Sequence, residues 1–319
     1  MSIRKLKVIF FNNYKFHKYN SSIHIDFIKN LESHFDIVEY GLRSGKFKSG
    51  LKAGSFSDFK KLYRSFDPDL FLSYNSNGSN PGKRNHERYT WMEQIYKFYD
   101  IPKFHFTVDF CRDGFEDKEI SWFEEMGIQN AIFRHKNYLK TKLKVNSFWV
   151  PFSVDRNMFT NNSVPFEKKK NLVSFVGTSS HKVYQKRRAA IEYLGKKKLL
   201  NHNQKKIILG QYVRALSKFK FGLTCGGTTD FFVAKYLEIP ASGSILVCTE
   251  TDGFDTIKKY VKHIVYDPEN MDEFLDKYSS MVSDPKIKKY IDESQNYVLV
   301  KHCHEKRVRQ FYKLVLENI

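Results

Sequence analysis

The chain has 319 residues, with 54 Lys and Arg against 35 Asp and Glu, and its net charge is +19. This length predicts two domains, and the 29 Phe and 19 Tyr exclude disorder for most of the chain. The low content of Gly and Pro, 16 and 8 residues, excludes collagen-like and low-complexity classes.

The first half alternates strands with helices. Apolar runs predict strands at 5–11, 37–40, 70–74, 103–108, 131–133 and 148–150. Apolar residues at helical spacing predict helices at 23–35, 56–66, 86–99 and 121–126. Between them, residues 41–57 are rich in Gly and Lys and are expected to form a basic loop. This alternation predicts an α/β fold, with a parallel sheet and crossover helices.

The second half begins after a polar segment without periodicity at 156–170, which we expect to be a linker. Strands are predicted at 172–177, 221–224, 245–248 and 263–266. Helices are predicted at 184–194, 212–219, 231–242 and 254–260, and from Met271 to the end. We therefore expect two Rossmann-like domains, at 1–155 and 171–300, and a helix at 301–319 that can pack back on the first domain. Two such domains imply a ligand cleft between them, at the carboxyl ends of the strands.

The positive charge is concentrated in two segments. Residues 168–220 contain fifteen Lys or Arg and one acid, Glu192, which accounts for fourteen of the nineteen net charges. Residues 41–64 contain seven Lys or Arg and only Asp58 as an acid. Such a charge favours contact with polyanions, namely nucleic acid, acidic glycans or an anionic lipid surface. The alternative is that lysines merely fill solvated surfaces.

A phosphate-binding turn is indicated where the strand at 172–177 ends. Gly177 and the small hydroxyl residue Thr178 lead into a helix that carries Lys186, Arg187 and Arg188. Glycine lets the backbone approach a phosphate, the start of a helix offers free N–H groups, and cationic side chains neutralise a diphosphate. The alternative is an ordinary strand–glycine–helix turn without a ligand.

Two acids in the second half form a second motif. Asp230 is expected at the mouth of the helix at 231–242, and Glu238 follows eight residues later. Eight helical residues span about 12 Å, so one carboxylate could contact the sugar end of an elongated ligand and the other its nucleoside end. Carboxylates suit hydroxyl groups because they accept hydrogen bonds from them. The alternative is two unrelated acids on an amphipathic helix.

The text of residues 172–312 resembles the C-terminal half of GT-B glycosyltransferases. The resemblance rests on LVSFVGT, ALSKFKFGLT, KYLEIPASGSILVCTETDGFDTI, YDPENMDEFLDKYSSMVSDP and HCHEKRVRQFY, in this order. It is strongest to the CgeB-like group of the retaining, family-four-like set (glycosyl transferases group 1). In the first half, only the α/β pattern and FWVPFSVDRNMF are similar. The resemblance implies two Rossmann-like domains that face each other across a cleft.

The resemblance also implies roles for single residues. Glu238 matches the acid that binds the nucleotide ribose, and Asp230 matches the first acid of an E-x7-E motif, which touches the donor sugar. Gly177 matches the glycine near the diphosphate, and Lys182, Arg187 or Arg188 match its basic partners. Two features depart from the family. The first acid is Asp where the family has Glu, and Asn12, Asn13 and Tyr14 replace the glycine-rich loop after the first strand.

Candidates on the acceptor side come from the first half. Asp109 follows a predicted strand and is a candidate catalytic base or hydroxyl orienter, although a structural acid at a strand end is an equal alternative. The other acceptor-side candidates are Tyr14, His24, Arg43, Lys46 and Lys48. We expect no metal, because Asp67-Pro-Asp69 is typical of a turn and His302 and His304 point in different directions on a helix. No other cofactor is expected.

These features predict a glycosyltransferase that moves a sugar from a nucleotide-sugar donor to an acceptor hydroxyl, with retention and without a metal. Asp109 and Asp230 are the candidate catalytic residues. The expected acceptor is a glycan, a surface polysaccharide or a lipid-linked sugar. The alternatives are a phage-type DNA glycosyltransferase acting on hydroxymethylated bases, and a non-catalytic nucleic-acid-binding protein. Four widely spaced cysteines and the lack of a signal peptide or long apolar run predict a cytoplasmic protein, able to bind peripherally to a membrane. The sequence predicts no oligomeric state.

Overall fold

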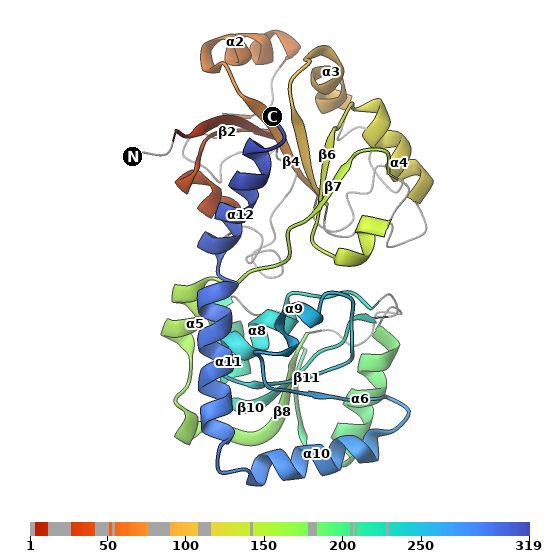
Figure 1. Ribbon diagram of the computed structural model, residues 1–319, viewed down its shortest axis with the longest axis vertical. Helices are drawn as coiled ribbons and strands as arrows, with labels where there is room; N and C mark the ends of the chain where they lie inside the picture. Colours follow the sequence, from red (N-terminus) through yellow and green to blue (C-terminus); the bar gives the residue numbers. More distant parts are fainter. Residues whose placement is uncertain are drawn as a thin grey trace. The chain divides into compact units, whose positions relative to one another are not determined.

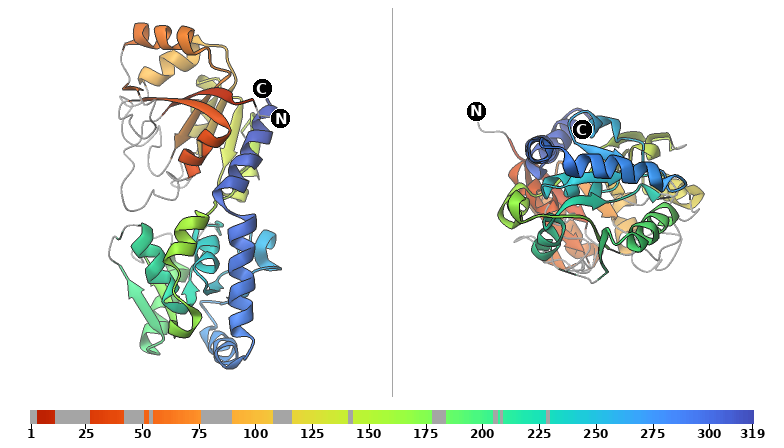
Figure 2. Two further views of the ribbon diagram at one scale, coloured as in Figure 1. Left: turned by 90° about the vertical axis from the view of Figure 1, so that its left-hand side faces the viewer. Right: turned by 90° about the horizontal axis from the view of Figure 1, so that it is seen from below.

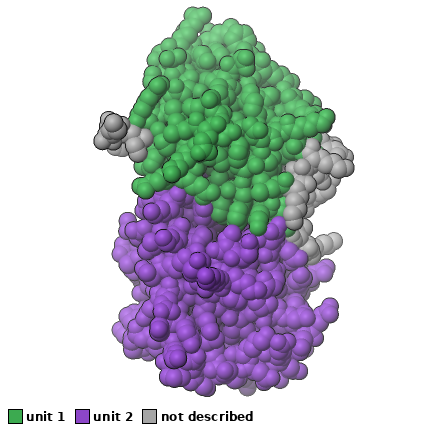
Figure 3. All heavy atoms as spheres, viewed as in Figure 1, with its two compact units in different colours: residues 1–17, 28–151, 308–319 green, residues 18–27, 152–307 purple. Residues whose placement is uncertain are grey.

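A computed structural model describes residues 4–11, 27–41, 51–52, 55–75, 90–107, 116–140, 143–177, 184–204, 207, 209–227 and 230–319. The chain divides into two compact units, shown in Figures 1 and 3. Unit 1 comprises residues 1–17, 28–151 and 308–319, and unit 2 comprises residues 18–27 and 152–307.

The described part of unit 1 contains a seven-stranded sheet in the order β3-β2-β1-β4-β5-β6-β7, and all neighbouring strands are parallel. Its strands are β1 (Leu6–Phe11), β2 (Phe35–Gly41), β3 (Leu51–Lys52), β4 (Leu70–Asn75), β5 (Lys103–Thr107), β6 (Asn130–Phe133) and β7 (Asn146–Trp149). Its helices are η1 (Leu31–Ser33), α2 (Phe56–Phe66), α3 (Thr90–Phe98), α4 (Glu116–Glu125) and η3 (Lys136–Lys140). The last helix of the chain, α12 (His304–Leu316), reaches unit 1, where the Tyr312 hydroxyl donates to the Arg4 carbonyl at 2.7 Å.

The core of unit 1 is aromatic. Phe11 at the end of β1 has its ring centroid 5.8 Å from that of Phe59 on α2 and 5.0 Å from those of Phe71 on β4 and Tyr96 on α3. The strands of a parallel sheet are buried on both faces, so they need apolar residues in uninterrupted runs. The aromatic and β-branched text of the first half meets this need.

Unit 2 contains, among its described residues, a five-stranded parallel sheet in the order β12-β11-β10-β8-β9. Its strands are β8 (Lys170–Val176), β9 (Leu200–Asn203), β10 (Phe219–Leu223), β11 (Ile245–Cys248) and β12 (His263–Val265). Its helices are α5 (Arg156–Asn162), η4 (Phe166–Lys168), α6 (Gln185–Lys196), α7 (Leu209–Ser217), α8 (Lys235–Ala241), α9 (Asp255–Lys258), α10 (Met271–Ser283) and α11 (Ile287–Lys301). Helix α11, blue in Figures 1 and 2, runs alongside α8 and contacts β11.

The strands of unit 2 are closely packed against its helices. Val173, Phe221 and Val247 are fully buried in one cluster that the helices α6, α10 and α11 complete. Cys225 and Cys248, at the carboxyl ends of β10 and β11, are buried free thiols, and burial raises the pKa of the Cys248 thiol well above its ordinary value. A buried Lys169 ammonium donates to the carbonyls of Ser217, at 2.6 Å, and Ser242, at 3.1 Å, and so joins the end of α7 to the end of α8.

The structure differs from the predicted elements at four places. The expected linker 156–170 contains α5, which Asp155 caps by accepting from the Met158 backbone N–H at 2.8 Å. The polar edge strand β9 was not predicted, because it lacks the apolar run that marks a buried strand. Residues 51–52 of the expected basic loop form the short strand β3, which pairs with β2. After it, Ser55 and Asp58 form a capping box at the start of α2.

The fourth difference concerns α8, which begins at Lys235 and not at Phe231. Asp230 has a left-handed backbone with φ of +49°, and Phe231 pairs with Asp252 in an isolated bridge. A residue in the left-handed region cannot belong to a right-handed helix. Asp230 therefore lies in the loop before α8, and the prediction that it stands at the mouth of the helix was wrong.

Gly222 in β10 provides a test of how closely α8 packs on the sheet. A Cβ atom at this position would lie 2.7 Å from Cγ2 of Ile239 on α8. We expect Gly222→Ala to lower the free energy of unfolding by about 1–3 kcal/mol, because the helix must move away from the strand. Urea denaturation should show the midpoint fall without a change in slope.

Gly195 in α6 is the matched control, because a Cβ atom there would meet nothing within 4 Å. Gly195→Ala should leave the midpoint unchanged or raise it. Equal effects of the two substitutions would contradict the close approach of α8 to β10.

Candidate active site

The strand order of unit 2 reverses at one place. The chain runs from β8 outward to β9 and then returns to place β10 on the other side of β8. The loops after β8 and β10 therefore diverge to opposite faces of the sheet and leave room between them, which is where parallel α/β sheets bind ligands. The residues at these two strand ends form the candidate site.

The loop after β8 starts at Gly177. Its N–H donates to the Asn203 carbonyl at 3.0 Å, and its carbonyl lies 3.1 Å from Nε2 of His202. Its φ of +138° is a conformation that side chains rarely allow. A Cβ atom here would lie 3.9 Å from Cε of Lys235, so the backbone at the end of β8 is next to the first residue of α8.

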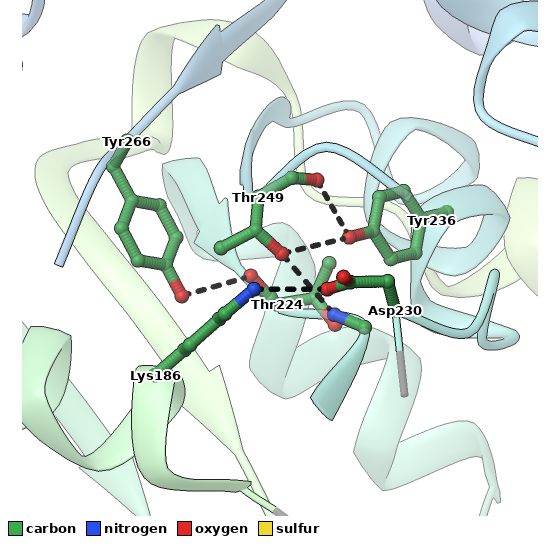
Figure 4. Close-up of polar contacts among 7 residues, drawn as sticks. Lys186, Thr224, Asp230, Tyr236, Thr249 and Tyr266 are labelled. Atoms are coloured by element: carbon green, nitrogen blue, oxygen red, sulfur yellow. Dashed lines mark hydrogen bonds and ion pairs between the residues drawn. The ribbon is translucent and has the colours of Figure 1, made fainter. Parts of the chain in front are cut away.

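The turn after β10 is equally tight. A Cβ atom on Gly226 would lie 2.8 Å from the backbone of Asp230 and 2.3 Å from Cγ2 of Thr251. The Gly226 N–H donates to Oγ1 of Thr249 at 3.3 Å, and the Tyr236 hydroxyl donates to the Thr249 carbonyl at 2.8 Å (Figure 4). This turn thus needs glycine at position 226, because the Asp230 backbone and the Thr251 side chain occupy the space of a Cβ atom.

Asp230 forms an ion pair with Lys186 of α6. Oδ1 of Asp230 lies 3.0 Å from Nζ of Lys186, and Figure 4 shows the two side chains pointing toward each other. Both side chains are nearly half exposed, at 47% and 42%. Asp and Asn tolerate the left-handed backbone better than other residues with a Cβ. The φ of +49° is therefore a local reason for Asp at this position, where the glycosyltransferase motif has Glu.

Glu238 lies in a different, buried network. It is 2% exposed and accepts a short hydrogen bond from the Tyr212 hydroxyl of α7. Lys235 donates to the Tyr212 hydroxyl at 2.7 Å, and its Nζ lies 3.9 Å from Oε2 of Glu238. Burial raises the pKa of Glu238, while Lys235 and Tyr212 oppose this shift. Burial next to the carboxylate raises the pKa of Tyr212 well above its ordinary value.

The basic residues of α6 are divided among different environments. Arg187 is 4% exposed, and its guanidinium lies 3.7 Å from the ring centroid of Tyr184 and 5.0 Å from that of Phe175. Arg188 is exposed, because successive helical residues face different directions. Of these three cations, Lys186 pairs with Asp230 and is partly exposed, Arg187 is buried, and Arg188 is exposed at the helix surface.

The other exposed cations of residues 168–220 lie at the opposite edge of the sheet. Among the described residues they stand at the starts of β8 and β10, at the end of α6 and in the last turn of α7, and they are Lys168, Lys170, Lys196, Lys197, Lys198, Arg214 and Lys218. In a parallel sheet, these positions mark the amino edge. A strand of seven residues spans about 23 Å, so these cations do not line the candidate site.

The structure thus brings predicted residues together in two places. Gly177 lies next to Lys235, the neighbour of Glu238, and Asp230 contacts Lys186 of α6. Sequence reasoning missed Tyr212 and Lys235. Lys235 is one helical turn before Glu238, which is a local signal, whereas Tyr212 is 26 residues away and only the fold shows its contact. The remaining predicted site residues lie outside the described part of the chain. They are Tyr14, His24, Arg43, Lys46, Lys48, Asp109, Thr178 and Lys182.

The described side chains include no group of three or more His, Cys, Asp and Glu arranged to hold a metal ion. Within the same residues, no helix has both the length and the apolar character needed to cross a bilayer.

Comparisons with known proteins give a fold. No protein-family model matches the chain, and no curated protein matches its sequence. Among solved structures, an alpha-glucosyltransferase in complex with UDP and a 13-mer DNA containing an HMU base is 10% identical, with a TM-score of 0.69 over 98% of this chain and 100% of that chain. HepE of Anabaena in complex with UDP and glucose is 10% identical, with a TM-score of 0.65 over 98% and 100%.

A glycosyltransferase from Rickettsia africae is also similar, at 10% identity and a TM-score of 0.63 over 99% of this chain and 100% of that chain. The expected α/β architecture with two parallel sheets is confirmed. The narrower resemblance to the CgeB-like group stays a prediction. The chain has the fold of these glycosyltransferases.

Proposed function

We propose that this chain is a glycosyltransferase whose unit 2 binds a nucleotide-sugar donor at the carboxyl ends of β8 and β10. The observation that carries the proposal is the pair of acids at this edge, each held by a cation: Asp230 by Lys186, and Glu238 by Lys235. Two of the similar structures contain UDP, which makes UDP-glucose the first donor to test.

In this proposal the two acids have different tasks because their exposure differs. Glu238, buried beside Lys235, accepts hydrogen bonds from the ribose hydroxyls. Asp230, nearly half exposed, accepts them from the sugar that is transferred. The ion pair with Lys186 orients the Asp230 carboxylate, and the tight turn at Gly226 lies against its backbone.

The leaving group is a nucleoside diphosphate, so its negative charge must be balanced as the bond to the sugar breaks. We assign this task to Lys186, Arg188 and the first N–H groups of α6, whose N-cap residue Tyr184 makes no side-chain cap. No step of the proposal needs a metal. The resemblance to the retaining set extends the proposal to retention at the anomeric carbon.

The acceptor in this proposal is a hydroxyl of an anionic molecule such as a glycan or a lipid-linked sugar. The basic amino edge of unit 2 supports docking on an anionic surface, away from the reacting groups. Asp109 remains our candidate for the acceptor-side base.

The first test is thermal unfolding with UDP. A ligand at 100 times its dissociation constant stabilises the folded state by about 2.7 kcal/mol, so UDP should raise Tm. Glu238→Gln keeps the shape of the side chain but loses its charge, and it should weaken UDP binding about 10- to 100-fold. Glu273→Gln, in an exposed ion pair on α10, is the control and should behave as the wild type. Failure of UDP, GDP and ADP to raise Tm would refute the proposed donor site.

The second test concerns the leaving group. Lys186→Met should lower kcat for UDP release from UDP-glucose about 100- to 1000-fold, because a charge that balances the transition state is lost. Coupled detection of UDP measures this rate. Lys277→Met removes an exposed cation of α10 and should leave the rate unchanged. A normal rate for Lys186→Met would exclude Lys186 from the reaction.

DNA is a second candidate acceptor, and the similarity to an alpha-glucosyltransferase bound to UDP and DNA favours it. This hypothesis predicts that duplex DNA binds and that its affinity falls at least about 1000-fold between 50 and 200 mM salt, as expected for about six phosphate contacts. Gel shifts at several salt concentrations measure the slope. The same duplex with hydroxymethylated bases should accept labelled glucose from UDP-glucose. Weak binding of the duplex and no transfer of label would reject DNA as the acceptor and leave the glycan as the candidate.

A further inference from the structure

Lys235 is a cation of unit 2 that neither the predicted motif nor the proposed leaving-group chemistry uses. Its ammonium donates to the Tyr212 hydroxyl at 2.7 Å and lies 4.6 Å from the centroid of the Tyr212 ring. Glu238 is an ion-pair partner at 3.9 Å, beyond hydrogen-bond distance. An ammonium has three hydrogens, and two of them have no partner among the residues that the structure describes.

The position of Lys235 places it at the phosphate end of the candidate site. Its Cε lies 3.9 Å from the place where Gly177 would carry a Cβ. Gly177 is the last described residue after β8, where the backbone is expected to approach a phosphate. A fifth of the Lys235 side chain is exposed, so a ligand at Gly177 can reach its ammonium.

Burial and neighbouring charged groups act together on the Lys235 ammonium. Three elements bring titratable groups to it: α7 brings the neutral Tyr212, α8 brings Glu238, and α6 brings Arg187, whose charge acts on Lys235. Burial and Arg187 lower the pKa of Lys235 to about 8, and Glu238 offsets part of this effect. The surroundings thus favour a further negative charge.

We propose that Lys235 binds the diphosphate of the donor and that Tyr212 and Glu238 are positioning residues that hold its ammonium at the end of β8. This inference rests on the proposed function, because it assigns a further contact within the same site. A bound diphosphate is an anion and so favours the charged form of Lys235, which means that an unprotonated Lys235 takes up one proton from the buffer when the diphosphate binds.

The pH dependence follows from the direction of this change. The free site holds the Lys235 proton only below about pH 8, and the bound diphosphate raises the pH at which the proton leaves. Between these two values, each pH unit should weaken diphosphate binding by up to about tenfold. Below about pH 7, where Lys235 is charged in both states, binding should not depend on this group.

The experiment is calorimetric titration of the full-length protein with UDP at pH 8.5, in two buffers with different ionisation enthalpies. The difference between the apparent enthalpies gives the number of protons taken up. We expect about half to one proton for the wild type. Lys235→Arg keeps the positive charge but does not titrate near this pH, so it should bind UDP without proton uptake and with the same affinity at pH 7 and 9. Tyr212→Phe should bind more weakly while proton uptake persists.

The outcomes separate the two proposals. Proton uptake by the wild type and its loss in Lys235→Arg would support the contact. UDP binding without uptake, or uptake that persists in Lys235→Arg, would overturn the role of Lys235 and leave the proposed function intact. No binding of UDP to the wild type would overturn the donor site and this inference with it.

Discussion

The burial of the Glu238 carboxylate is the constraint on which unit 2 depends. An ionised carboxylate out of water is costly unless it is paired and hydrogen-bonded. Tyr212 of α7 donates a hydrogen bond to this carboxylate, and Lys235 of α8 forms an ion pair with it. Because α8 must also approach β10 closely at Gly222, the carboxylate, the helix and the strand end are held in one arrangement. The candidate site is a consequence of this packing.

Most strands of both sheets could be predicted from the sequence, because a strand of a parallel sheet is buried on both faces and appears as an uninterrupted apolar run. Strand β11 was predicted with the same bounds as the structure has, Ile245–Cys248. The polar edge strand β9 lacked such a run. The start of α8 was placed too early because Phe231 pairs with Asp252 in an isolated bridge, a long-range contact that the local spacing does not contain.

The candidate site could be predicted only where its residues are near each other in the sequence. Asp230 and Glu238 are eight residues apart, and their motif was visible. The contact of Tyr212 with Glu238 depends on how α7 packs against α8, which sequence spacing does not contain. The dense charge of residues 168–220 did not show where in the fold its cations lie. The topology sends most of its exposed cations to the amino edge of the sheet, because the starts of β8 and β10 and the end of α6 meet there.

The buried cysteines of unit 2 have a consequence for following the molecule in solution. Cys225 lies just after β10, Cys248 ends the neighbouring strand β11, and both side chains are completely shielded from solvent. A thiol reagent reacts with the thiolate, and only after the local structure opens. The labelling rate of these two side chains therefore measures how often the structure at the carboxyl ends of β10 and β11 opens. A nucleotide that stabilises the closed structure at these strand ends would slow this labelling, and the natural cysteines report it without an engineered label site.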